Sequence, residues 1–109
     1  MAVRKTFEPK VIDGAEINAI ITEEEFYGSG RMFAHVRLLR GEAVDWHIHT
    51  DEIEYYYILS GEGIFTNSDK TEQRVSKGDV CTMDLGSGHA IKQAGDEILE
   101  FIALIVYTK

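Results

Sequence analysis

The sequence predicts an all-β domain folded as a small barrel or jelly roll. Ten glycines and a single proline punctuate the 109 residues, which is typical of short strands joined by tight turns. The stretches between the glycines are rich in β-branched and aromatic residues, which favour strands. Because open sheet edges invite aggregation, this many short antiparallel strands must close into a barrel or pack as two sheets.

The expected strands follow one another along the chain with little helix between them. Residues 15–26 fit either an N-terminal strand or a short helix, because their hydrophobic period does not decide between the two. The seven segments that read as strands are 32–39, 46–49, 53–59, 64–67, 80–84, 89–93 and 98–107.

The chain length fits one domain, in which residues 31–109 form the barrel and residues 1–30 form a segment that packs on the barrel or on a dimer partner. The segment 98–107 is apolar on both of its alternating faces, whereas an antiparallel strand usually leaves one face in water. A second copy of the chain is the simplest cover for the outer face, so we expect a homodimer. The N-terminal segment is the alternative cover.

Charge and composition exclude several classes of partner. The net charge is −8 and the cations are scattered and not gathered into a stripe, which argues against nucleic-acid binding. The longest uncharged apolar run, 101–107, is far shorter than the roughly 20 residues of a membrane-spanning helix, so no membrane partner is expected. The N-terminus lacks a secretory pattern, which predicts a cytoplasmic protein. The single cysteine, Cys81, cannot form an intramolecular disulfide.

A pair of histidines carries the first sign of chemistry. His47 and His49 are two residues apart in an expected strand, so their rings project from one face about 6–7 Å apart and can lean onto one ion. Glu54 reaches the same ion only if the chain reverses over the polar residues 50–52. Glu52 is the competing carboxylate, but we place it in the turn, where a charged residue is normally solvated.

The spacing around these residues resembles the two motifs of the cupin superfamily, GX5HXHX3–4EX6G and GX5PXGX2HX3N. Eight of the ten specified positions match, and the two departures are an Asp where the family has Pro and a Gln where it has Asn. The positions that correspond to the motifs are Gly41, His47, His49, Glu54, Gly61, Gly78, Asp84, Gly86, His89 and Gln93.

The resemblance implies a double-stranded β-helix, the jelly-roll barrel of the cupin fold, with a divalent transition metal inside it. The implied ligands are His47, His49, Glu54 and His89, with Mn, Fe, Ni or Zn as the metal. Four protein ligands close a tetrahedral zinc site but leave two adjacent positions free on an octahedral ion. We therefore expect a metal-dependent enzyme that acts on a small oxygen-rich molecule such as a carboxylate, keto acid or enediol.

The reaction class stays open among decarboxylation, oxygen insertion, lyase and isomerase chemistry. The alternative is a non-catalytic binding module in which the metal holds a sugar or carboxylate effector. In either case the expected partner is a small molecule.

Three further residues are candidates for contacting that molecule. Tyr56 shares a strand face with Glu54, and Gln93 shares one with His89, so both are expected to face the cavity. The alternative for both is a hydrogen-bonding role inside the barrel. His35 is the remaining histidine, and it fits either a supporting or substrate-contacting role or an ordinary surface position.

Overall fold

The structure is a computed structural model that describes residues 3–5, 8–12 and 14–109. Over these residues the chain forms ten strands and one short 3-10 turn, η1, at Glu24–Phe26. The strands are β1 (Lys10–Ile12), β2 (Ala15–Ile21), β3 (Gly30–Leu38), β4 (Ala43–Ile48), β5 (Glu52–Ser60), β6 (Glu62–Thr66), β7 (Glu72–Ser76), β8 (Val80–Cys81), β9 (Gly88–Ala94) and β10 (Leu99–Tyr107).

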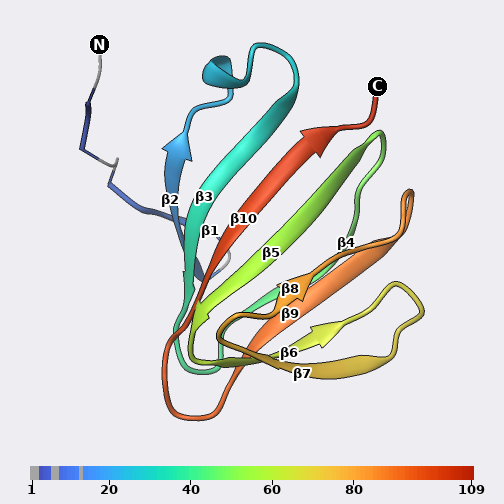
Figure 1. Ribbon diagram of the computed structural model, residues 1–109. Coiled ribbons are helices and arrows are strands. Elements are labelled where there is room, and N and C mark those ends of the chain that lie inside the picture. The colour runs from blue at the N-terminus through green and yellow to red at the C-terminus, as the bar shows by residue number, and fades with distance from the viewer. Residues whose placement is uncertain (1–2, 6–7, 13) are drawn as a thin grey trace.

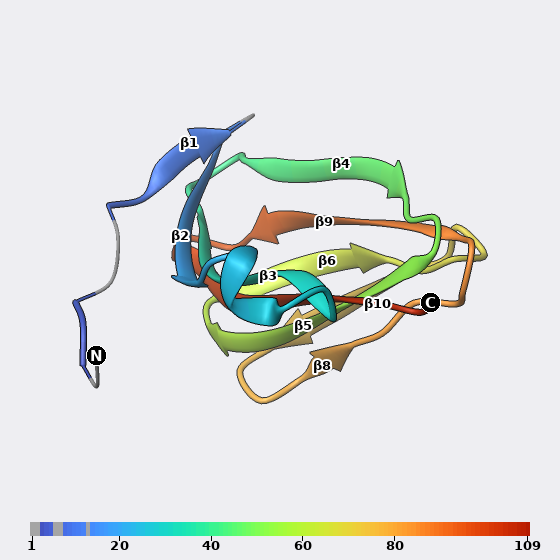
Figure 2. The same cartoon turned by 90° about the horizontal axis from the view of Figure 1, so that it is seen from above.

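The strands form two antiparallel sheets that face each other across one interior (Figures 1 and 2). The larger sheet has the order β1-β2-β3-β10-β5-β8, and the smaller has the order β4-β9-β6-β7. Neighbours in the sheets are mostly distant in sequence; β10, for example, lies between β3 and β5. The all-β jelly-roll class predicted from the sequence is therefore confirmed.

The core lies between the two sheets and follows from strand alternation. In β10, Phe101, Ala103 and Ile105 are buried against the facing sheet, while the residues between them are only partly buried. The same alternation buries Tyr56 and Ile58 in β5 and Ile91 in β9. The inward-facing residues thus fill the barrel and leave polar groups inside it only where the sequence places them on the inner face.

The N-terminal segment adds strands to the edge of the larger sheet. Residues 15–26, left open by the sequence, form the strand β2 followed by η1, and β2 pairs with β3. Figure 2 shows β1 and β2 curling from this edge toward β4. Residues 1–2, 6–7 and 13 lie outside the described residues, so the expectation that residues 1–30 pack on the barrel or on a partner remains a prediction.

Two strands were not expected from the sequence, and one expected strand is shorter. In β7, Val75 is the one buried residue, which is why the segment lacks an apolar pattern, and β1 is exposed throughout. Both strands lie at sheet edges, where pairing and not burial holds them. The expected strand 80–84 is reduced to the two residues of β8. A search of the described residues for a helix long and apolar enough to cross a membrane finds none.

Candidate metal centre

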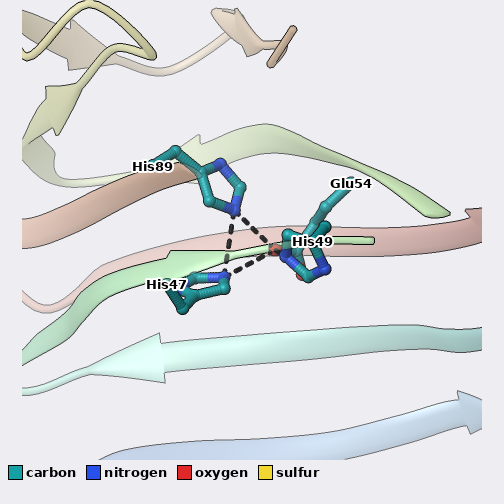
Figure 3. A group of neighbouring side chains, drawn as sticks. All are labelled: His47, His49, Glu54 and His89. Atoms are coloured by element: carbon teal, nitrogen blue, oxygen red, sulfur yellow. Dashed lines mark hydrogen bonds and ion pairs between the residues drawn. The ribbon is translucent and has the colours of Figure 1, made fainter. Parts of the chain in front are cut away.

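Four side chains from three strands and an adjoining loop point toward one another inside the barrel (Figure 3). His47 lies near the end of β4, His49 directly follows that strand, Glu54 is the third residue of β5 and His89 is the second residue of β9. Each offers one ligand atom, and these four atoms all lie within 4.8 Å of one another. His49, Glu54 and His89 are buried, whereas His47 is partly exposed.

Local structure explains how residues distant in sequence meet here. The chain reverses after His49, as the sequence predicted, and Asp51 in this turn takes a φ of 60°, which Asp tolerates better than most residues. Glu54 is thereby brought back beside the two histidines. His89 arrives by strand pairing, since it lies directly opposite His47 in the β4–β9 ladder.

A β-bulge in β4 aims His47 into the barrel. The pairing with β9 shifts between Val44 and His47, so that both of these side chains line the interior although they are three residues apart. Within the bulge, the carbonyl oxygen of Asp45 lies 2.8 Å from His47 Nδ1. A carbonyl only accepts, so Nδ1 carries the hydrogen, and the Nε2 of a neutral His47 presents its lone pair to the cluster.

His49 is oriented in the same way by Glu52. Its Nδ1 lies 2.6 Å from Glu52 Oε1, and the Arg31 guanidinium beside Glu52 holds the pKa of that carboxyl at about 2, so Glu52 is ionised and accepts the hydrogen. The Nε2 atom of His49 is again left to face the cluster. Such partners on the far nitrogen typically fix the orientation of metal-binding imidazoles.

The expectation that Glu52 is a solvated turn residue was wrong. Glu52 is the first residue of β5, its side chain is largely buried, and it shares the inward face of that strand with Glu54. The strand begins one residue earlier than the sequence indicated, because Glu52 pairs with Tyr107 of β10. The alternation of Glu52, Glu54 and Tyr56 is the sequence signal that would have identified it.

The distances within the cluster match neighbouring ligands on one ion. Glu54 Oε1 lies 3.3 Å from His47 Nε2, 3.0 Å from His49 Nε2 and 2.9 Å from His89 Nε2. The Nε2 atoms of His47 and His89 are 3.0 Å apart. Two atoms each about 2.1 Å from an ion are separated by about 3.0 Å at right angles and about 3.4 Å in a tetrahedron. The residues present therefore fit a metal.

The charges and lone pairs in the cluster also favour a bound cation. With their Nδ1 hydrogens donated elsewhere, neutral His47 and His49 turn lone pairs toward the carboxylate oxygen of Glu54, and these groups repel one another. Only cations between them, either protons on the rings or a metal ion, relieve that repulsion. The geometry thus gives a cluster that is able to hold a metal.

The pKa values show how protons act when no metal is bound. Hydrogen bonds with Glu54 raise the pKa of His47 and of His49 above the ordinary value, against the effect of burial. For His89 burial dominates and lowers the pKa. Burial acts to raise the pKa of Glu54, but hydrogen bonds from the three histidines outweigh it and hold that pKa far below its usual range. Glu54 is thus the permanent negative charge of the cluster.

The cluster opens onto a cavity of about 160 Å³ inside the barrel. Apart from the cluster residues the lining is mostly apolar, and it includes two polar side chains, Tyr56 and Arg31. The Tyr56 hydroxyl donates to Glu54 Oε1 at 3.1 Å, and its ring stacks on that of His89 with an interplanar angle of 11°. Tyr56 therefore lies at the site, as the alternation in β5 predicted.

The other two predicted contact residues lie elsewhere. Gln93 is on the inner face of β9, but its oxygen accepts from the backbone N–H of Gly41 and its nitrogen donates to three backbone carbonyls, those of Ala94, Gly95 and Glu97. His35 alternates with the buried Ala34 and Val36, so it projects from the outer face of β3, where it contacts Glu100 at 2.9 Å. The structure brings neither residue to the cluster.

The fold and the cluster define a small jelly-roll barrel with a metal-competent set of three histidines and one glutamate in its interior. Residues 34–107 match the family model described as Cupin domain. The chain belongs to the cupin family.

The chain is also similar to individual proteins and solved structures. The oxalate-binding protein of Thermotoga maritima is 38% identical over 91 residues, which cover 84% of this chain and 74% of that protein. The crystal structure of a predicted oxalate decarboxylase from Thermotoga maritima superposes with a TM-score of 0.86 at 34% identity and covers 92% of both chains. The Cnp3 cupin domain of Schizosaccharomyces pombe, with a TM-score of 0.77 and 19% identity over 90% of this chain and 68% of that one, shares the fold.

Proposed function

We propose that this protein binds a divalent metal through His47, His49, Glu54 and His89 and uses it to hold a small carboxylate, with oxalate as the leading candidate. The observation that carries the proposal is the convergence of these four ligand atoms at a cavity inside the barrel. The candidate metals are Mn, Fe, Ni and Zn. A bound ion of this kind supplies Lewis-acid attraction for carboxylate oxygens.

The size of the cavity supports a small ligand. A volume of about 160 Å³ corresponds to roughly five water molecules at about 30 Å³ each, and it lies below the roughly 300 Å³ at which pockets for drug-sized ligands begin. A two-carbon dicarboxylate, with six non-hydrogen atoms, is of this size. The name of the Thermotoga maritima oxalate-binding protein supports the same ligand.

The surrounding residues favour binding. The apolar lining, which includes Val36 and Phe101, lowers the local dielectric constant and so strengthens the attraction between opposite charges in the cavity. Tyr56 holds Glu54 in place through its hydroxyl, and burial raises the pKa of Tyr56 well above 10, so that it remains a neutral donor.

Binding without turnover is the function we favour over catalysis. Among the described residues that line the cavity, the groups outside the cluster that carry exchangeable protons are Tyr56 and Arg31, and neither is an effective acid near neutral pH. Oxalate decarboxylation, the second candidate, requires a proton for the formate product. The name of the Thermotoga maritima structure favours that reaction.

Calorimetry on metal-free and Mn²⁺-loaded protein tests the proposal. We expect oxalate to bind only the Mn²⁺-loaded form, with one site per chain, and to change the electron paramagnetic resonance spectrum of the Mn²⁺. Equal oxalate binding by both forms, or by neither, would contradict the proposal. Formate release from the same samples would establish the enzymatic alternative.

We also propose that two copies pair through the outer face of the larger sheet. The strands β1 and β2 of the N-terminal segment extend the sheet beside β3, next to β10's neighbour and not over β10, which favours a second copy as the cover for this face. Apolar side chains remain partly exposed there, with Tyr57 and Val80 at 49% and 61% exposure. Light scattering should give a dimer mass that falls to the monomer mass in Leu104→Lys.

A further inference from the structure

Arg31 is a cation in the wall of the metal-site cavity that the proposed function does not use. Simple alternation along β3 would place it outside the barrel, because Ala34 and Val36 face inward. The pairing with β10 shifts at this point: Met32 lies opposite Ile105, and Gly30 lies opposite Val106. Arg31 is therefore the extra residue of a β-bulge, and both Arg31 and Met32 line the cavity.

Glu52 holds the guanidinium of Arg31 from one side only. Arg31 Nε donates to Glu52 Oε2 at 2.8 Å, and Nη2 donates to Glu52 Oε1 at 2.7 Å. An arginine has five N–H donors, and two of them are used here. Within the described part of the chain no hydrogen bond is found for Nη1, so the end of the guanidinium formed by Nη1 and the second Nη2 hydrogen is free to bind another carboxylate.

The same carboxylate connects Arg31 to the metal ligands. Glu52 Oε1 accepts from both Arg31 and His49, and His49 is within 3.0 Å of Glu54. The negative charge of Glu54 also contributes to raising the pKa of the Arg31 guanidinium. The cavity thus has the ligand cluster at one part of its wall and a fixed arginine fork at another.

We infer that Arg31 receives the carboxylate end of the ligand that the metal does not hold, and so makes the site selective for dicarboxylates over monocarboxylates. This inference rests on the proposed function, because it requires one end of the ligand to be held at the cluster. A planar guanidinium with two free parallel N–H groups matches a carboxylate. The bulge in β3 turns Arg31 inward, and the two hydrogen bonds to Glu52 fix the orientation of its guanidinium.

The alternative is that Arg31 only neutralises Glu52, which would otherwise be a largely buried carboxylate. Removing Arg31 alone would then disturb His49 and the metal, and oxalate and monocarboxylates would weaken together. Two variants separate these roles. Arg31→Met removes the fork, and the double variant Arg31→Met with Glu52→Gln also removes the unpaired charge while its amide oxygen still accepts from His49 Nδ1.

The experiment compares oxalate with oxamate, which has the same shape but carries an amide in place of one carboxylate. Mn²⁺-loaded wild type, both variants and the control Arg37→Met are titrated with each compound, and metal content is measured by elemental analysis. Arg37 is a matched control because it pairs with Glu16 and Glu100 on the outer face. We expect the double variant to retain Mn²⁺ and to lose at least about tenfold in oxalate affinity, with little change for oxamate.

Two results would overturn the inference while leaving the proposed function intact. One is an unchanged ratio of oxalate to oxamate affinity in the double variant. The other is loss of Mn²⁺ from Arg31→Met with oxalate and oxamate weakened together, which would show that Arg31 acts through Glu52 and His49. Failure of the proposed function has a different signature, because the Mn²⁺-loaded wild type would then bind no oxalate at all.

Discussion

The strand β9 carries two buried polar side chains whose environments are opposite. His89 is 1% exposed and lies beside two other imidazoles and a carboxylate. The Nε2 atoms of the three histidines and Oε1 of Glu54 all face the centre of the cluster. Gln93, 9% exposed and four residues further along, finds one backbone donor and three backbone acceptors. Gln93 is satisfied by the protein alone, whereas the cluster is satisfied only when a cation is added.

This contrast shows that burial alone does not separate a structural polar residue from a functional one. Both side chains occupy motif positions, and both face the barrel interior. The two residues differ in the hydrogen-bonding character of their partners. A side chain whose donors meet acceptors stabilises the fold, whereas several acceptors that face one another form a site for a cation. Substitutions at the two parts of β9 should therefore differ in effect, with loss of metal at the cluster and loss of stability at Gln93.

The largest effect is expected from removing one ligand of the cluster. His49→Ala should abolish stoichiometric metal uptake, because His49 is buried and is one of only three imidazoles that face Glu54. Elemental analysis of the purified protein measures this. His35→Ala is the control, since His35 lies on the outer face beside Glu100 and should leave metal content unchanged. Full metal content in His49→Ala would remove the basis for the site.

Lowering the pH should weaken metal binding by about a hundredfold between pH 8 and pH 5.5. The metal must displace protons from His47 and His49, and because the pKa values of both are raised by Glu54, the loss should begin above the ordinary histidine value of about 6.5. Glu54 stays ionised over this range and contributes nothing to the loss. Titrations with Mn²⁺ at several pH values measure the effect, and a flat profile would rule out histidine ligation.

Gln93→Ala should show the opposite behaviour, with lower stability and unchanged metal content. The substitution leaves the N–H of Gly41 and three carbonyls without their partner, which should cost about 2 kcal/mol in the free energy of unfolding. Urea denaturation of the metal-free protein measures that cost, with His35→Ala again as the comparison. A loss of metal with unchanged stability would reverse the roles assigned to the two parts of β9.

The sequence predicted most of the fold because strand alternation and glycine spacing are local properties. The same alternation predicted inward-facing side chains for Tyr56 in β5 and Gln93 in β9, and both are buried. The motif resemblance identified the four residues that the structure brings together, although their mutual distances depend on pairing between β4 and β9 that no local pattern reveals.

What the sequence missed has one physical cause, which is that β-bulges and strand ends change which face a residue occupies. Arg31 lines the cavity only because a bulge inverts its direction, and an alternating pattern assigns it to the outer face. Glu52 was assigned to a turn because its pairing with Tyr107, which extends β5, is a long-range contact. Glu52 occupies an unspecified position of the first motif and Arg31 precedes that motif, so the resemblance marks neither residue.

The smallest expected effect concerns Glu52, and it tests whether the four ligand residues depend on the carboxylate that orients His49. Glu52→Gln keeps an oxygen that can accept from His49 Nδ1 but removes the negative charge that makes this bond short, so metal affinity should fall by about tenfold while stoichiometry stays at one. Glu62→Gln is the matched control, because Glu62 also pairs with an arginine, Arg74, but on the exposed surface of β6. Equal affinities in the two variants would mean that Glu54 and the three imidazoles orient themselves without Glu52.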